Sequence, residues 1–305
     1  MVTGRAMGAA VCAALLAAGA SPAAGKTDDT PPKENVPVVA GERMSARFVD
    51  LIAHDTFGVA KVVVVRFAGP VQRRAAAVNG LSVTVRGAEQ PLVGAWQWLD
   101  SRTVAYRPKK WWPEKSSVTV TVDLADVVLR EQRNGRTFIG SSYTRQFRIG
   151  RKMVMTVNNK KHTLTVKQSG KKRRSIPVSL GQRGWETRSG VKVLNGEKFA
   201  RLQMYGDFPA RGAQWNVLAP YSIRLTPGGE FIHGAPWASH RLGRWNGSRG
   251  CTNVSVKHAK WLYQRVLPGD PVVTKGTGKP LTKKLANRES WPWNVTWKQW
   301  SGKRN

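Results

Sequence analysis

Hydrophobic and polar residues alternate along much of the first half of the chain. Residues 117–124 read Ser-Val-Thr-Val-Thr-Val-Asp-Leu, which predicts a strand with one buried face. Residues 61–67 and 81–85 are rich in β-branched residues, as strands commonly are. Asn79-Gly80 and Asn134-Gly135 supply the residue types that tight hairpin turns favour. The pattern predicts an all-β module in this part of the chain.

A second β region opens near Ile149-Gly150. Residues 153–157 and 162–166 are strand-like and flank the sequence Asn158-Asn159-Lys160-Lys161, which predicts another hairpin. One main helix is predicted much later, over residues 256–266. The fold class is therefore mainly β.

The predicted helix has recognisable start and stop signals. Ala259 and Leu262 recur at helical spacing, and Ser255 can cap the first turn. Pro268-Gly269 ends the pattern, since proline cannot continue a helix.

The N-terminus has the layout of a cleavable secretory signal. Arg5 precedes an apolar run over residues 7–20, and small residues follow it. The run is shorter than the roughly 20 apolar residues of a spanning helix, although an uncleaved membrane anchor is the alternative. The predicted parts are a signal peptide (1–25), a linker (26–40), the all-β module (41–148), a second β-rich domain (149–275) and a Trp-rich C-terminal segment (276–305). We expect the indoles of that last segment to pack on the second domain.

The charge balance is strongly basic. The 305 residues include 50 Lys and Arg against 18 Asp and Glu, a formal net charge of +32. Such an excess favours a polyanionic neighbour. The charge is spread along the chain and the protein is predicted to be exported, so we expect an anionic envelope polymer and no nucleic acid. A broadly solvated basic surface without a specific partner is the alternative.

Cysteine usage narrows the candidate chemistry. Of two cysteines, Cys12 lies within the predicted signal, so the mature protein holds only Cys251 and no intramolecular disulfide. A lipidated Cys12 is disfavoured because the apolar run continues after it. A lone thiol in an oxidising compartment points to a chemical role.

The residues around Cys251 suit a nucleophile. Gly250 permits a tight turn whose backbone amides can form an oxyanion hole. Arg249 and the N-terminus of the helix after Ser255 are expected to favour the thiolate.

A cysteine nucleophile needs a base, and His233 is preferred because it ends the apolar stretch Phe231-Ile232 at a strand terminus. We expect the sulfur within hydrogen-bond reach of this ring, about 3 to 4 Å. His240, in a loop, is the second candidate. A zinc site from Cys251, His233, His240 and His258 lacks the usual paired spacing, and an inert buried cysteine is the remaining alternative.

The segments Ile232-His233-Gly234 and 248–254 (Ser-Arg-Gly-Cys-Thr-Asn-Val) resemble the signature of the L,D-transpeptidases. The resemblance extends from Ile149 to Asp270. The preceding module, with Trp96-Gln97-Trp98, is similar to the immunoglobulin-like domain of actinobacterial members. The implied fold is an immunoglobulin-like β-sandwich followed by a β-rich catalytic domain.

The resemblance implies a reaction. In that family a cysteine attacks the carbonyl between the third and fourth residues of a peptidoglycan tetrapeptide stem, releases D-alanine and forms a thioester. An amine of a neighbouring stem then resolves the thioester into a 3→3 cross-link. No metal or organic cofactor is implied, and carbapenems are the expected inhibitors.

The resemblance also implies roles for individual residues. Cys251 is similar to the nucleophile, His233 to the base, and the Gly234 carbonyl to the group that orients the imidazole. The amides of Gly250 and Cys251 would form the oxyanion hole. Residues implied to line the substrate cleft are Tyr221, Trp237, Ser248 and Asn253. Many relatives have histidine where this chain has Arg249, so the resemblance leaves open whether Arg249 assists the oxyanion or the thiolate.

Other functions share these features. Water in place of the amine would make an L,D-carboxypeptidase, and the same thioester could attach a protein to the stem. A non-catalytic wall-binding protein is a different class. We expect a monomer, secreted across the cytoplasmic membrane into the cell wall or a periplasm-like space, or tethered to the membrane if the signal is not cleaved.

Overall fold

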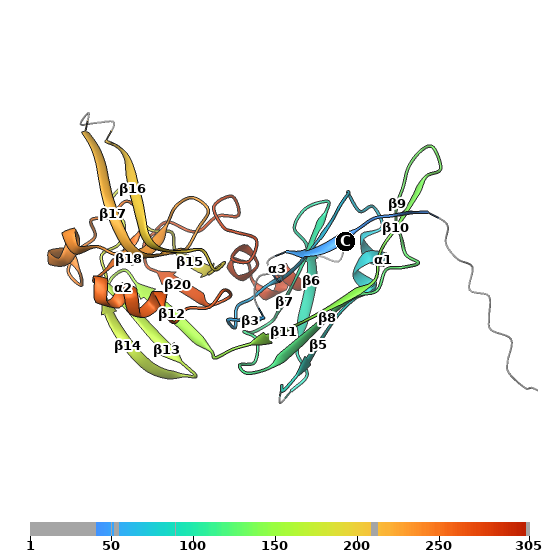
Figure 1. Cartoon of the computed structure of the whole chain (residues 1–305), viewed down its shortest axis with the longest axis horizontal. Helices are drawn as coiled ribbons and strands as arrows, with labels where there is room; N and C mark the ends of the chain where they lie inside the picture. Colours follow the sequence, from blue (N-terminus) through green and yellow to red (C-terminus); the bar gives the residue numbers. More distant parts are fainter. Residues whose placement is uncertain (1–40, 50, 52–54, 89, 209–212, 303–305) are drawn as a thin grey trace, which may run out of the picture. The chain divides into compact units, whose positions relative to one another are not determined.

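A computed structural model describes residues 41–49, 51, 55–88, 90–208 and 213–302 (Figure 1). The predicted signal peptide with Cys12, and the predicted linker, lie outside these residues. The described residues belong to one compact unit. Within the described part, no helix is long and apolar enough to cross a membrane.

The first module is built almost entirely of strands. Its elements are β1 (Glu42–Arg43), β2 (Ala46–Val49), β3 (Thr56–Phe57), β4 (Val63–Phe67), α1 (Arg74–Asn79), β5 (Leu81–Arg86), β6 (Gly94–Trp98), β7 (Thr103–Pro108), β8 (Ser117–Val122), β9 (Val128–Glu131), β10 (Thr137–Ile139) and β11 (Tyr143–Ile149). Two four-stranded sheets, β3-β11-β8-β5 and β2-β4-β7-β6, carry the residues of one apolar core, and β1-β10-β9 form a third sheet.

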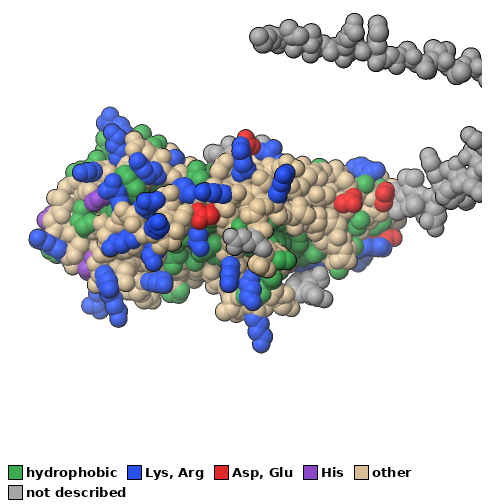
Figure 2. All heavy atoms as spheres, turned by 90° about the horizontal axis from the view of Figure 1, so that it is seen from below, with side chains coloured by type: hydrophobic (Ala, Val, Ile, Leu, Met, Phe, Trp, Pro, Cys, Tyr) green, Lys and Arg blue, Asp and Glu red, His purple; other side chains and the backbone are tan. Residues whose placement is uncertain are grey.

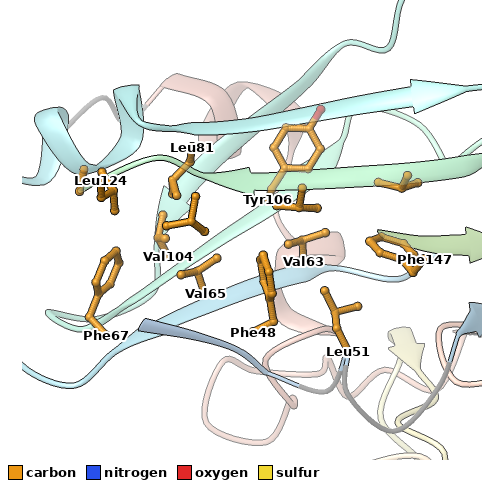
Figure 3. Close-up of a cluster of buried hydrophobic side chains, with 14 of the residues drawn as sticks. Phe48, Leu51, Val63, Val65, Phe67, Leu81, Val104, Tyr106, Leu124 and Phe147 are labelled. Atoms are coloured by element: carbon orange, nitrogen blue, oxygen red, sulfur yellow. The ribbon is translucent and has the colours of Figure 1, made fainter. Parts of the chain in front are cut away.

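Strand β8 shows why the alternating pattern folds this way. Val118, Val120 and Val122 are fully buried, whereas Thr119 and Thr121 are half-buried. The predicted strand is therefore confirmed. Figure 3 shows the core that these inward faces build, with valines and phenylalanines from several strands meeting.

The two predicted turns have different outcomes. Gly135, between β9 and β10, has the positive φ of 78° that a tight turn needs. The hairpin predicted at Asn79-Gly80 is wrong. Asn79 ends α1, and Gly80 follows it with φ −85°. Gly80 is instead suited to close packing, since a Cβ there would lie 2.3 Å from the Asp123 carbonyl oxygen.

The second domain combines two sheets with one main helix. Its elements are β12 (Met153–Asn158), β13 (Thr163–Gln168), β14 (Lys171–Pro177), β15 (Gly190–Val193), β16 (Lys198–Phe208), β17 (Ala213–Arg224), β18 (Phe231–Gly234), η1 (Pro236–Arg241), β19 (Thr252–Val254), α2 (Val256–Tyr263) and β20 (Pro271–Lys275), followed by η2 (Trp291–Asn294) and α3 (Trp297–Gly302). The sheets are β14-β13-β12-β20-β15 and β16-β17-β18-β19. Apolar residues of both sheets and of α2 share one core.

The predicted hairpin and helix of this domain are confirmed. Strands β12 and β13 pair antiparallel on either side of the predicted turn. The Ser255 hydroxyl accepts a hydrogen bond from the His258 amide and so caps α2. The helix ends at Tyr263, three residues earlier than expected, and a turn continues the chain.

The indoles of the C-terminal segment were expected to pack on the second domain, but they pack mainly on the first module. Trp300 is buried with Val62, Val64 and Ala105 of the first module, and its indole N–H donates to the Ala95 carbonyl at 3.0 Å. Only the earlier part of the segment bonds to β15, as where Asn294 contacts Val191.

The rings of the segment also surround one cation of the first module. The Arg107 guanidinium lies 4.7, 5.2 and 5.4 Å from the ring centroids of Trp293, Trp297 and Trp300. Such cation–π contacts are favourable, so they fix the segment on the first module.

Replacing Gly58 with alanine is expected to destabilise the protein by about 1–3 kcal/mol, because the added methyl overfills a packed site. A Cβ at Gly58 would lie 2.3 Å from the Asp270 backbone nitrogen. The urea unfolding midpoint measures the effect. Gly302→Ala is the matched control, since a Cβ there meets nothing within 4 Å. Equal midpoints for the two variants would contradict the close packing at Gly58.

Candidate active site

Cys251 and His233 line one cavity of about 460 Å³. His233 lies on β18, and Cys251 comes directly before the neighbouring strand β19. These two strands run parallel, with His233 opposite Asn253. Two motifs that are separated in sequence therefore meet at one edge of a sheet. Of the predicted cleft residues, Trp237, Ser248 and Asn253 also line this cavity, as does Arg249.

The turn before Cys251 has the geometry that a glycine allows. Gly250 has φ +108°, in the region that side chains rarely adopt. The Ser248 hydroxyl accepts a hydrogen bond from the Gly250 amide at 3.2 Å and donates to the Cys251 carbonyl at 2.6 Å. Ser248 thus spans the turn and fixes the direction of the backbone around the thiol.

His233 is held in one orientation and one tautomer. Its ring is buried, and Nδ1 lies 2.9 Å from the Gly234 carbonyl oxygen. A carbonyl only accepts, so Nδ1 carries the proton and Nε2 keeps its lone pair. Burial lowers the pKa of His233, and the hydrogen bond to Gly234 opposes that shift in part. The ring is therefore a neutral base at neutral pH, stacked against Trp237 at 5.8 Å between centroids.

The Cys251 thiol does not follow the expectation that Arg249 and the helix terminus favour the thiolate. Burial raises the pKa of Cys251 to about 11, and a hydrogen bond from the Phe231 backbone opposes the shift. The sulfur donates to the Gly229 carbonyl, at 3.6 Å. Among the described residues the expected thiol–imidazole hydrogen bond is not formed. At rest the cavity thus holds a thiol and a neutral imidazole that are not hydrogen-bonded to each other.

The structure does not bring Tyr221 into this cavity. Its ring packs against Tyr263 of α2, 5.6 Å between centroids, and its backbone has a positive φ of 53°. His240 and His258 do not line this cavity either. His240 contacts Arg241, and His258 contacts Ser255 at the start of α2.

The alternative zinc site is not supported by the geometry. The described residues contain no group of three or more His, Cys, Asp or Glu side chains placed to hold a metal ion.

Sequence patterns missed the roof of the cavity. Met204 of β16 and Val217 of β17 face each other in register and line it. These two strands form the long hairpin labelled in Figure 1. Alternation within residues 198–206 could have indicated a strand. The sequence of that strand does not indicate that it lines the cavity of the thiol. Other lining residues that were not predicted are Gln182, Arg241 and Gly247.

Comparison with known proteins shows which family this site resembles. Residues 152–274 match the family described as L,D-transpeptidase catalytic domain, and residues 22–128 match a bacterial Ig domain. The chain contains an L,D-transpeptidase catalytic domain. The predicted resemblance and the predicted fold, an immunoglobulin-like domain followed by this catalytic domain, are confirmed.

Similar L,D-transpeptidases occur in mycobacteria. The chain is 29% identical over 253 residues to L,D-transpeptidase 2 of Mycobacterium tuberculosis, covering 81% of this chain and 59% of that protein. It is 28% identical to L,D-transpeptidase 5 of the same species, covering 80% of this chain and 53% of that protein. The chain therefore spans little more than half the length of these two relatives.

Solved structures agree with the sequence comparison. An L,D-transpeptidase from Mycobacterium smegmatis superposes with a TM-score of 0.60 at 26% identity, covering 76% of this chain and 99% of that one. An L,D-transpeptidase in complex with imipenem gives a TM-score of 0.62 at 27% identity, with the same coverage.

Proposed function

We propose that this protein is an L,D-transpeptidase that forms 3→3 cross-links in peptidoglycan, with Cys251 as nucleophile and His233 as base. One observation carries the proposal. The single cysteine of the described residues stands on a positive-φ glycine turn, in the same cavity as a neutral imidazole whose Nε2 is available. The related L,D-transpeptidases support the choice of substrate.

The first half of the reaction makes a thioester. Rotation of the thiol away from the Gly229 carbonyl lets Nε2 of His233 take its proton, and the sulfur attacks the carbonyl carbon after the third stem residue. The Cys251 amide receives the developing oxyanion, and the Gly250 amide joins it by releasing the Ser248 hydroxyl to which it donates at rest. When the tetrahedral intermediate collapses, the terminal D-alanine leaves as an amine, with the proton from the imidazolium.

The second half transfers the acyl group. An amine of a neighbouring stem attacks the thioester, His233 takes the proton of that amine, and the Cys251 thiolate departs and is reprotonated. Water in place of the amine gives the L,D-carboxypeptidase reaction, and an amine of a protein gives attachment to the stem. The thioester half is common to all three reactions.

The cavity suits a peptide that carries carboxylates. Arg241 and Arg249 contribute cations to its lining, Trp237 is 39% exposed beside His233, and Met204 offers apolar contact. We assign substrate contact to Trp237 and Asn253, and turn support to Ser248. Arg249 lines the same cavity as Cys251, and we propose that its cation stabilises the oxyanion.

Tyr221 is proposed to have an indirect, supporting role. Because its ring packs on Tyr263 of α2, we propose that it supports the wall of the cleft behind His233 and does not touch the substrate.

The proposed location is outside the cytoplasmic membrane, in the cell wall. Lys and Arg side chains are spread over the face shown in Figure 2, with few acidic residues among them. Strand β14 alone carries Lys171, Lys172, Arg173 and Arg174. This surface suits an anionic envelope polymer, as in the predicted partnership, and the protein is proposed to act as a monomer. A non-catalytic wall-binding protein would use the same charge but not the thiol.

The proposal is tested with purified protein and a disaccharide-tetrapeptide from peptidoglycan. We expect mass spectrometry to show a 3→3 linked dimer with release of D-alanine, and one imipenem added per chain in the intact-mass spectrum. Tripeptide without dimer would assign the carboxypeptidase reaction. If the protein is folded by circular dichroism but gives neither product nor adduct, the proposed enzyme activity is overturned.

A further inference from the structure

A buried ion pair lies behind the nucleophile. Lys192 of β15 is fully buried, and its Nζ lies 3.1 Å from Oε2 of Glu230, the residue before β18. The ammonium group also donates to the Arg188 carbonyl at 2.5 Å and to the Thr274 hydroxyl at 3.1 Å. Neither charge takes part in the acyl-transfer steps described above, although both are buried within the catalytic domain.

The Glu230 side chain faces Gly250, in the turn that carries the thiol. A Cβ added at Gly250 would lie 3.8 Å from Glu230 Cγ and 3.9 Å from its Oε1. The same Oε1 accepts a hydrogen bond from the Arg188 amide at 2.8 Å. Glu230 and Gly250 also line one cavity of about 290 Å³. The Glu230 side chain therefore lies on the side of the turn where Gly250 has no Cβ.

The backbone of Glu230 also fixes the neighbouring turn. Its carbonyl accepts from the Leu225 amide at 2.8 Å, and its amide donates to the Thr226 hydroxyl at 3.2 Å. Gly229, the acceptor of the thiol hydrogen bond, is the preceding residue. The Glu230 side chain thus faces the thiol-bearing turn, and its backbone is joined directly to the residue that accepts the thiol hydrogen bond.

Both charges act on the thiol, in opposite directions. The Glu230 carboxylate raises the pKa of Cys251, and the Lys192 ammonium lowers it. Burying two charges is costly unless they pair well, so this arrangement is expensive if it only fills space. A lone Glu230 behind Cys251 would oppose thiolate formation, and Lys192 offsets that effect.

We propose that the buried Lys192–Glu230 pair positions the nucleophile: Glu230 supports the Gly250–Cys251 turn from behind, and the opposed charges balance the field at the sulfur. The inference rests on the proposed function and adds two positioning residues to it. The other charged or titratable groups that line the cavity of the thiol are His233 on β18, Arg241 on η1 and Arg249 on the turn.

Variants that remove one charge of the Lys192–Glu230 pair at a time test the proposal. Glu230→Gln leaves an unopposed ammonium near the sulfur, and Lys192→Met leaves an unopposed carboxylate. We expect the first to lower and the second to raise the thiol pKa, each by about one pH unit. The double variant should return close to the wild type. The readout is the rate of iodoacetamide alkylation of Cys251 against pH, followed by intact mass.

The chain contains a matched control. Lys61 and Glu289 form a second buried Lys–Glu pair, at 2.6 Å, and neither acts on the thiol. Glu289→Gln should therefore leave the alkylation profile unchanged. A purely structural role for Lys192–Glu230 predicts no opposite shifts.

Shifts in the same direction for both single variants, or none in either folded variant, would overturn the proposal. If Lys192→Met does not fold, Glu230→Gln alone decides, because its amide can still accept from Arg188. Alkylation of the thiol needs no peptidoglycan. If the wild-type protein formed no cross-links, the proposed function would be contradicted, but the alkylation test of the Lys192–Glu230 pair would still be valid.

Discussion

Replacing Cys251 with alanine is expected to abolish thioester chemistry, with loss of D-alanine release and of 3→3 dimers by at least about 10³-fold. The imipenem adduct should disappear as well, since the sulfur is the atom acylated. Alanine keeps the backbone turn at Gly250 and fits where the cysteine side chain stood, so the fold should persist. The measurement is product analysis by mass spectrometry on the purified protein.

Cys12 provides the matched control for this result. It is the other cysteine of the sequence and lies in the predicted signal, outside the described residues. In the unprocessed full-length chain, which still holds Cys12, Cys12→Ala should retain full product formation and the adduct. Dimer formation by a folded Cys251→Ala variant would remove the cysteine mechanism, and an adduct lost only with Cys12 would move the reactive thiol elsewhere.

Local patterns predicted the elements whose environment is regular. The alternation over residues 117–122 is sufficient for β8 because a two-sheet sandwich buries every second residue. Ser255 predicted the start of α2 because capping involves only neighbouring residues. Asn79-Gly80 misled, since the close approach of the Asp123 carbonyl, and not a turn, requires Gly80. That contact joins distant parts of the sequence.

The candidate site divides in the same way. His233 and the Gly250–Cys251 turn could be predicted because each belongs to a short motif, which the family resemblance then paired. The roof residues Met204 and Val217 could not, because a strand pattern does not say which surface it covers. The thiol pKa was misjudged because burial by the whole fold raises it, an effect that the neighbouring sequence does not reveal.

Buried charges were the least predictable feature. Lys61 and Lys192 look like ordinary strand residues in sequence, yet both are almost fully buried. Their partners Glu289 and Glu230 come from distant segments. Lysine is rarely buried without such a partner, and pairing across the sequence appears only in three dimensions.

His233→Gln is expected to lower kcat/KM for acyl transfer by about 10²- to 10⁴-fold, the usual contribution of a general base. Glutamine occupies a similar volume and its amide can donate to the Gly234 carbonyl, but it cannot accept a proton at neutral pH. The effect should therefore be on the chemical step, and the fold should persist.

The pH profile separates a base from a merely structural residue. Burial lowers the pKa of His233, so the neutral, active form persists as pH falls to values where an ordinary histidine would be protonated. The wild-type rate should decline only below that ordinary range, and the variant should lose this acid limb. His240→Gln is the matched control, because His240 does not line the cavity. An unchanged acid limb in His233→Gln, or its loss in His240→Gln, would assign the base to another group.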